Sequence, residues 1–465
     1  MKHSATAIEQ SNGMNPDERR SAIALAIIFM MRMLGLFMIL PVFMLHADQY
    51  SGYTAAAAGF AFGVYGLTQG LFQIPFGTLS DHLGRKNVIA AGLLIFAIGS
   101  VVAALADSIV MVTVGRALQG LGAIAGAGLA LLADLTRDEH RTKAMAIVGV
   151  SIGMAFALAM VLGPALAAFG GLAGLFWFTG ILALGGIAIL YWVVPDPAET
   201  HFHRDTETDT GTLGQVLSDG QLLRLDFGVL ALHVLMTATF TVLPLALRDT
   251  VGLADTEHWK FYLPVLAASV VLMVPFIIYA ERRARLKQAL VGAVAVLALV
   301  ELGLAEFPTG LIEMAILMVI YFTAFNLLEA SLPSLVSRLA PPDMKGTAMG
   351  AYSTSQYLGA FIGGAGGGWA AGSLGPSAVY LGCAGLAAVW LAITIGMRNP
   401  RTLSNRLVAV GAVGGDAISD LTTRLLSVPG VVEAVVNAED GIAYLKVDTK
   451  RLDAEALRAF STSNA

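Results

Sequence analysis

The sequence is poor in cysteine and in charge. Its single cysteine, Cys383, excludes a disulfide framework and a thiolate metal site within the chain. Charged residues make up only 13% of the 465 residues. The sequence also lacks a Gly-x-x-x-x-Gly-Lys-Ser/Thr segment, the loop that binds ATP phosphates. Primary pumping is therefore unsupported, and no metal or cofactor is predicted.

Long apolar runs are what the sequence has in abundance. Hydrophobic residues make up 56% of the chain, and the mean hydropathy is +0.73. Such values indicate a membrane protein. A membrane-crossing helix needs about 20 apolar residues, and this rule predicts twelve helices. They cover 20–45, 54–76, 88–106, 109–133, 143–169, 174–194, 223–247, 258–280, 288–306, 311–335, 345–371 and 375–397.

Basic residues are concentrated in the predicted loops on one side of the membrane. Loops after helices 2, 4, 8 and 10 contain Arg85, Lys86, Arg137, Arg141, Lys143, Arg282, Arg283, Arg285, Lys287, Arg338 and Lys345. The opposite loops offer only Arg248 and Lys260. Because cytoplasmic loops are rich in Lys and Arg, both termini are predicted to be cytoplasmic. The first apolar run is long and lacks a cleavage signature, so it is predicted to be retained.

A polar stretch divides the hydrophobic part of the chain. Residues 195–222 lose hydrophobic periodicity and are predicted to form a cytoplasmic linker between two blocks of six helices. The predicted organisation is a polar tail (1–18), an N-terminal half (19–194), this linker, a C-terminal half (223–398) and a cytoplasmic domain (404–465).

The two halves are related in sequence. QIPFGTLSDHLGR (73–85) aligns with MVPFIIYAERRAR (273–285), which pairs Pro75, Phe76, Asp81 and Arg85 with Pro275, Phe276, Glu281 and Arg285. Two further segment pairs align at similar offsets, 36–45 with 239–248 and 143–151 with 347–355. Two parallel six-helix repeats are the architecture of the major facilitator superfamily, which the chain resembles. The resemblance implies an all-α membrane fold of twelve helices in two six-helix halves.

The turn GTLSDHLGRK (77–86) resembles motif A of that superfamily, at the family's place between helices 2 and 3. His82 departs from the usual base. The resemblance implies a conformational latch that holds the halves together at the cytoplasmic side, built from Gly77, Asp81, Gly84, Arg85, Lys86 and Asp134. It places Asp81 near the start of helix 11, around 345–349. The alternative, a merely basic loop, explains Arg85 and Lys86 but not Asp81 or the glycines.

Two more segments resemble family motifs. GRALQGLGAIAGAG (115–128) resembles motif B and places Arg116 inside apolar sequence, where a charge counts by default as functional. GVSIGMAFALAMVLGP (149–164) resembles motif C of the drug:proton antiporter branch, in which a Gly-Pro kink lets helices slide. The usual Gly-Gly pair appears only at 170–171, and this departure weakens the assignment to that branch.

Three charged residues inside the predicted helices are assigned to proton coupling: Glu329, Arg32 and Arg116. Glu329 lies among apolar side chains, so its charged form is poorly solvated, as a group that loads and releases a proton requires. A capped structural glutamate is the alternative. Arg32 is expected to pair with an acid or a carbonyl; it serves either substrate anions and proton-linked charge, or a structural salt bridge that positions helix 1.

Polar and aromatic side chains at helical spacing are predicted to line a substrate cavity: Tyr65, Gln69, Phe72, Gln73, Gln119, Phe325, Asn326, Tyr352 and Gln356. Such stripes also join membrane helices, which is the alternative interpretation. A lone histidine is usually a packing residue, so His233 is not assigned to the site. Glu301, Glu306 and Glu313 are expected near hydrated outer ends of helices 9 and 10.

Residues 404–460 follow a strand, helix, strand, strand, helix pattern. This order predicts a small α+β ferredoxin-like domain, similar to the C-terminal domain of a bacterial member of the family. It resembles metallochaperone modules too, but it has no Cys-x-x-Cys pair, so metal binding is not expected.

These features predict a proton-gradient-driven secondary transporter that works by alternating access and exports a small amphipathic compound. The alternatives are a proton-coupled importer of a polar or anionic metabolite, and a sensor that uses the C-terminal domain. An intact motif A argues against the sensor. The expected partners are a small-molecule substrate, protons and the lipid bilayer of a bacterial inner membrane, with no nucleic acid, and the expected working unit is a monomer.

Overall fold

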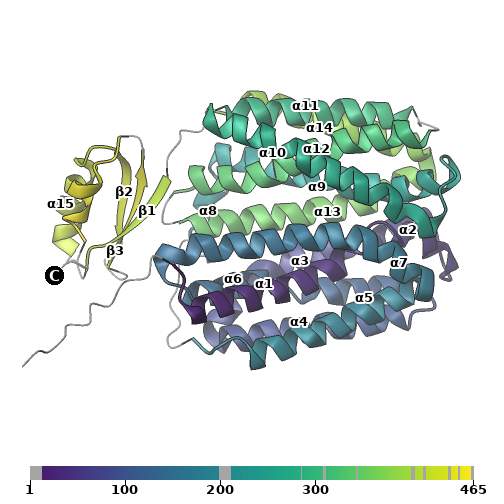
Figure 1. Cartoon of the computed structure of the whole chain (residues 1–465), viewed down its shortest axis with the longest axis horizontal. Coiled ribbons are helices and arrows are strands. Elements are labelled where there is room, and N and C mark those ends of the chain that lie inside the picture. Colours follow the sequence, from purple (N-terminus) through teal and green to yellow (C-terminus); the bar gives the residue numbers. More distant parts are fainter. Residues whose placement is uncertain are drawn as a thin grey trace, which may run out of the picture.

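The computed structural model describes residues 13–197, 211–283, 285–306, 310–341, 344–398, 404–411, 415–437, 441–448 and 451–461. Long helices run side by side in a bundle, and a small domain of strands and helices lies beyond one end of it (Figure 1). We call the end next to this domain the domain-side end and the opposite end the far end. Residues 198–210 of the predicted linker lie outside the described residues.

The first half of the bundle is formed by α1 (Pro16–Phe37), α3 (Ala55–Leu83), α4 (Arg85–Ala104), α5 (Ile109–Leu121), α6 (Ala125–Asp134) and α7 (Asp138–Trp192). Between α1 and α3 lie α2 (Phe43–His46) and the 3-10 helix η1 (Ala47–Gln49). Within α7, Gly171 has a φ of 59°, which a glycine adopts without a Cβ clash. The chain kinks there, so α7 contains the fifth and sixth predicted crossings.

The second half follows a short helix, α8 (Leu213–Val216), that lies in the predicted linker. Its helices are α9 (Gly220–Asp249), η2 (Asp255–Glu257), α10 (His258–Arg282), α11 (Leu286–Ala305), α12 (Leu311–Leu339), α13 (Lys345–Leu374) and α14 (Pro376–Ile395). In the described residues, ten helical segments are long and apolar enough to cross a membrane. The kinked α7 counts once among them, and α13 is absent because glycines and polar residues interrupt it; with both included, the bundle has the twelve predicted crossings.

The largest differences from the predicted extents are in the first, second and fourth helices. α3 ends at Leu83 instead of residue 76, so Gly77 and Asp81 of the predicted turn are helical. α1 ends at Phe37 instead of residue 45, because Pro41 has no N–H to donate to the Phe37 carbonyl. It begins at Pro16, inside the predicted polar tail, where Asn15 and Glu18 cap it reciprocally. The predicted fourth helix is interrupted at 122–124, between α5 and α6.

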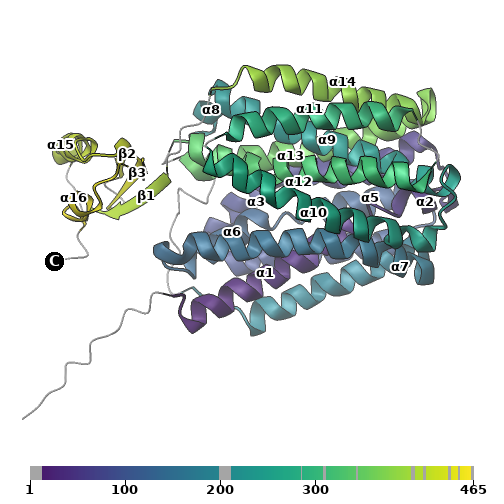
Figure 2. The same ribbon diagram turned by 45° about the horizontal axis from the view of Figure 1, so that its top comes forward.

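The C-terminal domain has the predicted order of elements, β1 (Ser404–Ala409), α15 (Gly415–Leu426), β2 (Val431–Asn437), β3 (Ile442–Val447) and α16 (Ala454–Arg458). The strands form an antiparallel sheet in the order β1-β3-β2. This is the arrangement of a split β-α-β unit, in which the third strand lies between the first two. Figure 2 shows the domain beyond the domain-side end from a second direction.

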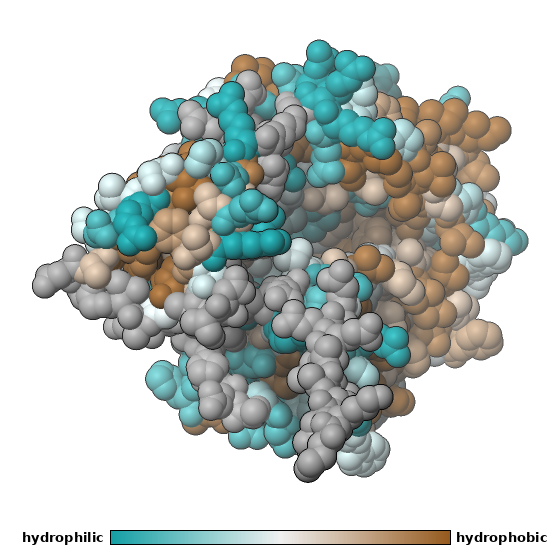
Figure 3. Space-filling model, turned by 60° about the vertical axis from the view of Figure 1, so that its left-hand side comes forward, coloured by the Kyte–Doolittle hydropathy of each residue, from teal (hydrophilic) through white to brown (hydrophobic). Residues whose placement is uncertain are grey.

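The outer surface of the bundle is apolar along its sides and polar at the domain-side end. Figure 3 views that end, where hydrophilic residues gather, while hydrophobic residues cover the sides behind it. The exposed apolar side chains include Leu71, Ile98, Val110, Val271 and Ile312. Exposure of so many large apolar groups suits a surface solvated by lipid rather than by water.

Candidate functional site

The two halves meet along α3 and α13, and the fit is closest near the far end. A Cβ atom added to Gly59 would lie 2.6 Å from Cα of Gly368. One added to Gly70 would lie 3.3 Å from the carbonyl oxygen of Thr354, and one added to Gly77 meets no atom within 4 Å. Glycine permits this backbone contact between helices. The halves therefore touch at the far end and separate toward the domain-side end.

The predicted latch lies at the domain-side end. Gly77 and Asp81 belong to the last turns of α3, Gly84 forms the turn, and Arg85 begins α4. Gly84 has a φ of 86°, so the turn requires a residue without a Cβ. The buried guanidinium of Arg85 donates to the Asp81 carboxylate and, at 3.3 Å, to Oδ2 of Asp134. The structure thus brings Asp81, Arg85 and Asp134 together within the first half.

A cavity of about 80 Å³ separates this turn from the start of α13. Its lining includes Gly77, Asp81 and Arg85 on one side and Gly346, Met349 and Gly350 on the other. Within the described residues, Asp81 bonds to Arg85 and makes no hydrogen bond to α13. Lys86 points elsewhere, because its Nζ lies 2.8 Å from Oδ1 of Asp196 and donates to the Val194 carbonyl at 2.6 Å.

Arg32 is the centre of a buried polar network in the first half. Its Nη2 donates to Oε1 of Gln69 at 2.6 Å and to the carbonyl oxygen of Gly122 at 2.7 Å. That carbonyl is available because the helix is interrupted between α5 and α6. Gln69 in turn donates to Oε1 of Gln73 at 3.0 Å. In the described part of the chain, no carboxylate pairs with Arg32.

A second buried arginine lies beside this network. Arg116 donates to Oε1 of Gln119 at 2.9 Å and to the Phe62 carbonyl at 3.3 Å. Its Cζ lies 5.0 Å from the centre of the Tyr65 ring, and Cζ of Arg32 lies 5.9 Å from the same centre. Tyr65 therefore contacts two guanidinium groups, each able to interact with the ring face.

Glu329 forms the corresponding cluster in the second half. Gln356 donates through Nε2 to Oε1 of Glu329 at 3.2 Å, and the same nitrogen lies 2.9 Å from Nε2 of His233. Nδ1 of His233 lies 3.1 Å from the Val229 carbonyl, which fits a neutral ring with its proton on Nδ1. The Glu329 side chain is 39% exposed. Among described residues, no lysine or arginine pairs with it.

Two predicted cavity residues lie next to this cluster on α12. The ring of Phe325 packs against that of His233, with centroids 6.1 Å apart. Asn326 donates through Nδ2 to Oγ of Ser269 at 3.2 Å. Asn326 therefore links α12 to α10. Phe325 is buried and packs against the rings of Tyr321 and Phe322.

Two tyrosines of α13 lie in electrostatic range of charged groups in the bundle. Tyr352 is buried, its hydroxyl has no hydrogen-bond partner in the described structure, and it lies in electrostatic range of Glu329 and Asp226. Asp226 of α9 is also buried. Tyr357 lies in electrostatic range of both Arg32 and Glu329. Sequence reasoning missed Asp226 and Tyr357, although a charge inside an apolar run was a usable signal for the first.

Three residues differ from what the sequence predicted for them. Phe72 is 37% exposed and is rotated away from the buried Gln69 and Gln73, since one helical residue turns a side chain by about 100°. His233 was not assigned to the site, yet its Nε2 lies 2.9 Å from Nε2 of Gln356, within the Glu329 cluster. Glu301 was expected at a hydrated end, and this is wrong: it is 0% exposed and accepts a hydrogen bond from Thr239 at 2.9 Å.

Two six-helix halves that close on one another around buried polar groups define a multi-pass membrane transporter. The chain belongs to the Major Facilitator Superfamily, whose model matches residues 25–364. It is 46% identical over 437 residues to the Inner membrane transport protein YajR of Escherichia coli, with 94% of this chain and 96% of that protein covered. It is 27% identical to the Multidrug resistance protein MdtH of Aeromonas salmonicida, over 74% of this chain and 86% of that protein.

Solved structures share the fold. A bacterial homolog of the human lysosomal transporter Spinster, in an inward-facing and occupied conformation, matches with a TM-score of 0.67 at 15% identity, over 82% of this chain and 97% of that one. A point mutant of the nucleoside transporter NupG matches with a TM-score of 0.64 at 15% identity, over 81% of this chain and 99% of that one. The predicted family and fold are thereby confirmed.

Proposed function

We propose that this transporter is driven by the proton gradient of a bacterial inner membrane and exports a small amphipathic compound by alternating access. The Glu329 cluster is the observation that carries the proposal. Its carboxylate is bound by a neutral amide and lies 3.9 Å from an imidazole, and its side chain is partly exposed inside the bundle. A carboxylate in such a setting can exchange a proton and sense a ligand in the same space.

The packing of α3 and α13 supports alternating access. We assign the domain-side end to the cytoplasm, so that contact at the far end and separation at the domain-side end correspond to an inward-facing arrangement. In the outward-facing arrangement, Asp81 would close the cavity and meet the N-terminus of α13, whose free N–H groups attract a carboxylate. The proton would bind Glu329 from outside and leave to the cytoplasm when the substrate binds.

Purified protein in proteoliposomes tests this proposal. A thermal-shift screen of a chemically diverse library first identifies a ligand, and flux of that ligand is then measured with and without an imposed pH gradient. We expect the gradient to accelerate flux at least tenfold and a protonophore to remove the acceleration. Flux that is indifferent to the gradient would contradict proton coupling, and acceleration only in the direction of uptake would contradict export.

Import of an anionic metabolite is the second candidate, and it rests on a different observation. Arg32 and Arg116 are buried, and among the described residues neither pairs with a carboxylate. An anion could supply the missing negative charge, although backbone carbonyls and the Tyr65 ring already contact both groups. If the screen yields only anions, and Arg32→Gln abolishes their thermal shifts, the anion importer replaces the exporter.

Asp81→Ala is expected to favour the inward-facing arrangement, because it removes the charged partner that the start of α13 would meet in the other arrangement. Ser353→Cys, in a Cys383→Ser background, places a reporter thiol in the cavity. Loss of a contact worth about 1.4 kcal/mol shifts a two-state equilibrium roughly tenfold, and the labelling rate from the cytoplasmic side should rise accordingly. Arg85→Ala should act in the same direction.

Arg282→Ala is the matched control for the latch, since Arg282 is an exposed basic residue in the last turn of α10, in the second half. Its labelling rate should equal that of the parent. An unchanged rate in both Asp81→Ala and Arg85→Ala would refute the latch.

Deletion of residues 404–465 is expected to leave an inserted, folded twelve-helix bundle, because we propose that the tail is an independent domain. The domain has its own core, which includes Leu425, Leu445, Val447 and Leu457. Membrane fractionation and size-exclusion chromatography measure the outcome. Loss of insertion would contradict separate domains, whereas altered transport with normal insertion would indicate regulation by the domain.

A further inference from the structure

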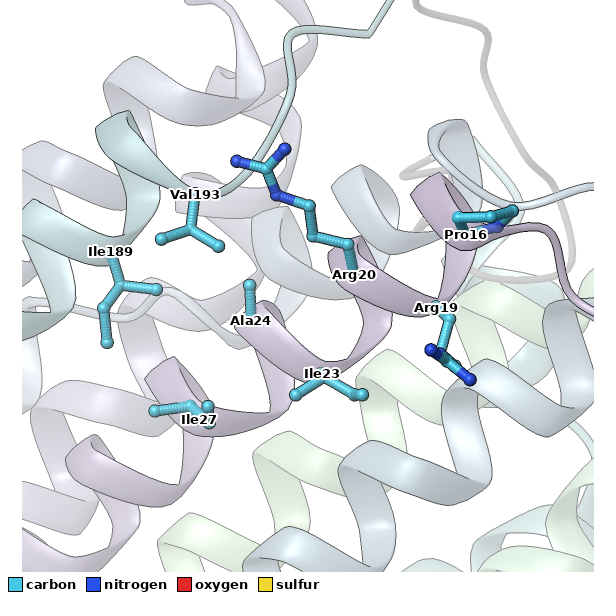
Figure 4. Close-up of a pocket in the computed structure, with 8 residues that line it drawn as sticks. All are labelled: Pro16, Arg19, Arg20, Ile23, Ala24, Ile27, Ile189 and Val193. Carbon is cyan, nitrogen blue, oxygen red and sulfur yellow. The ribbon is translucent and has the colours of Figure 1, made fainter.

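The structure contains a groove on the outer wall of the first half, between the first turns of α1 and the last turns of α7. Its volume is about 320 Å³, and it is lined by Pro16, Arg19, Arg20, Ile23, Ala24, Ile27, Ile189 and Val193. Figure 4 shows Ile189 and Val193 facing the α1 residues, with the Arg20 side chain above Ala24 and Arg19 nearer Pro16. We propose that this groove binds an anionic phospholipid, with the phosphate at Arg20, the charge of Arg19 on the other side of α1 adding to the attraction, and an acyl chain along the isoleucines.

The polar end of the groove lies at the depth of a membrane interface. Tyr191 and Trp192, in the last turn of α7, are exposed, Trp192 by 82%. Exposed Tyr and Trp at the end of an apolar helix mark the level of the lipid headgroups. Arg20 is at the same level, because its Nη2 lies 3.5 Å from the carbonyl oxygen of Trp192.

The walls below the arginines suit a hydrocarbon chain. From Arg20 to Ile27 the helix advances by about 10 Å, since each residue contributes about 1.5 Å. Ile23 on this path is 46% exposed, and the lining from Ile23 to Ile27 and from Ile189 to Val193 is apolar. A soluble phosphate would leave this surface uncovered, whereas a lipid covers it.

Charge selects the headgroup. Arg19 and Arg20 have no carboxylate partner among the described residues, and the neighbouring Glu18 pairs with Arg137 at 2.8 Å. The groove lining contains no acid that could bind the cation of a zwitterionic lipid. Two guanidinium groups with free donors therefore favour a lipid with net negative charge.

Native mass spectrometry of the full-length protein tests the proposal with dioleoyl phosphatidylglycerol, dioleoyl phosphatidylcholine and inorganic phosphate as probes. We expect retention of phosphatidylglycerol and at least fivefold weaker retention of phosphatidylcholine. Inorganic phosphate alone should neither be retained nor change the melting temperature. Each arginine near a lipid headgroup is worth about 1 kcal/mol, so Arg19→Gln with Arg20→Gln should weaken phosphatidylglycerol binding about 25-fold.

The matched control replaces two exposed arginines at the same end, Arg282→Gln with Arg283→Gln, which changes the net charge equally without altering the groove. Equal losses in the two double variants would overturn the proposal in favour of general surface attraction. Ile189→Trp fills the groove and should also reduce binding; full binding by this variant would overturn the acyl-chain assignment. Lipid binding that rises when residues 2–12 are removed would assign the groove to that segment instead.

Discussion

Glu329→Gln is expected to insert, to fold and to bind substrate, yet to lose the acceleration of transport by an imposed pH gradient, a fall of at least tenfold. Glutamine retains an oxygen that can accept from Gln356, so the hydrogen bond of 3.2 Å can persist. It cannot titrate. The substitution therefore separates the proton step from the packing of α9, α12 and α13, and flux in proteoliposomes with and without a gradient measures it.

Glu313→Gln provides the matched control, because Glu313 is an exposed acid in the first turn of the same helix, α12. Its gradient response should equal that of the parent. A full response in Glu329→Gln would remove Glu329 as the proton carrier. Asp226 would then be tested next, since it is buried, one of its oxygens has no partner in the described structure, and Tyr352 lies in electrostatic range of both acids.

Gly368→Ala is expected to block closure of the far end and to reduce transport at least tenfold. A Cβ at this position would lie 2.5 Å from Cα of Gly59 and 2.6 Å from the carbonyl oxygen of Ala55, both backbone atoms that cannot rotate away. Overpacking of this kind costs about 1–3 kcal/mol. Because the proposed cycle closes this end, labelling of the Ser353→Cys thiol from the far side should rise as transport falls.

Gly366→Ala on the same helix is the control that separates the steric clash from the change in helix propensity. Its Cβ would meet no atom within 4 Å, and it brings the same gain in helix propensity, up to about 1 kcal/mol. Transport by this variant should be close to that of the parent. Equal transport by the two alanine variants would show that the close approach of α3 and α13 is not needed in the cycle.

The features that were predictable from sequence are those written in local patterns. Crossing helices follow from the length of apolar runs, and the turn at Gly84 follows from a glycine placed among charged residues. The strand and helix order of the C-terminal domain follows from alternating patterns between turn residues, and the observed sheet agrees with it. In each case a local pattern is enough to predict the element.

The rest depends on partners distant in the chain. The break at 122–124 is invisible to hydropathy because the run continues through it, yet its free carbonyl is stabilised by Arg32, 90 residues earlier. The sequence around His233 indicates a packing residue, and its partner Gln356 lies 123 positions later in the chain. Glu301 is buried, and Thr239 of another helix donates to its carboxylate. No local pattern encodes such pairings.

The buried side chain of Lys446 connects the C-terminal domain to the helical bundle. Its Nζ lies 3.0 Å from Oε2 of Glu433 within the domain and donates to the carbonyl oxygen of Leu339, the last residue of α12, at 3.2 Å. This hydrogen bond links the domain to the second half. If the halves rotate relative to one another, the domain should move with α12. The distance between a spin label on the domain and one on the first half would then report the rotation.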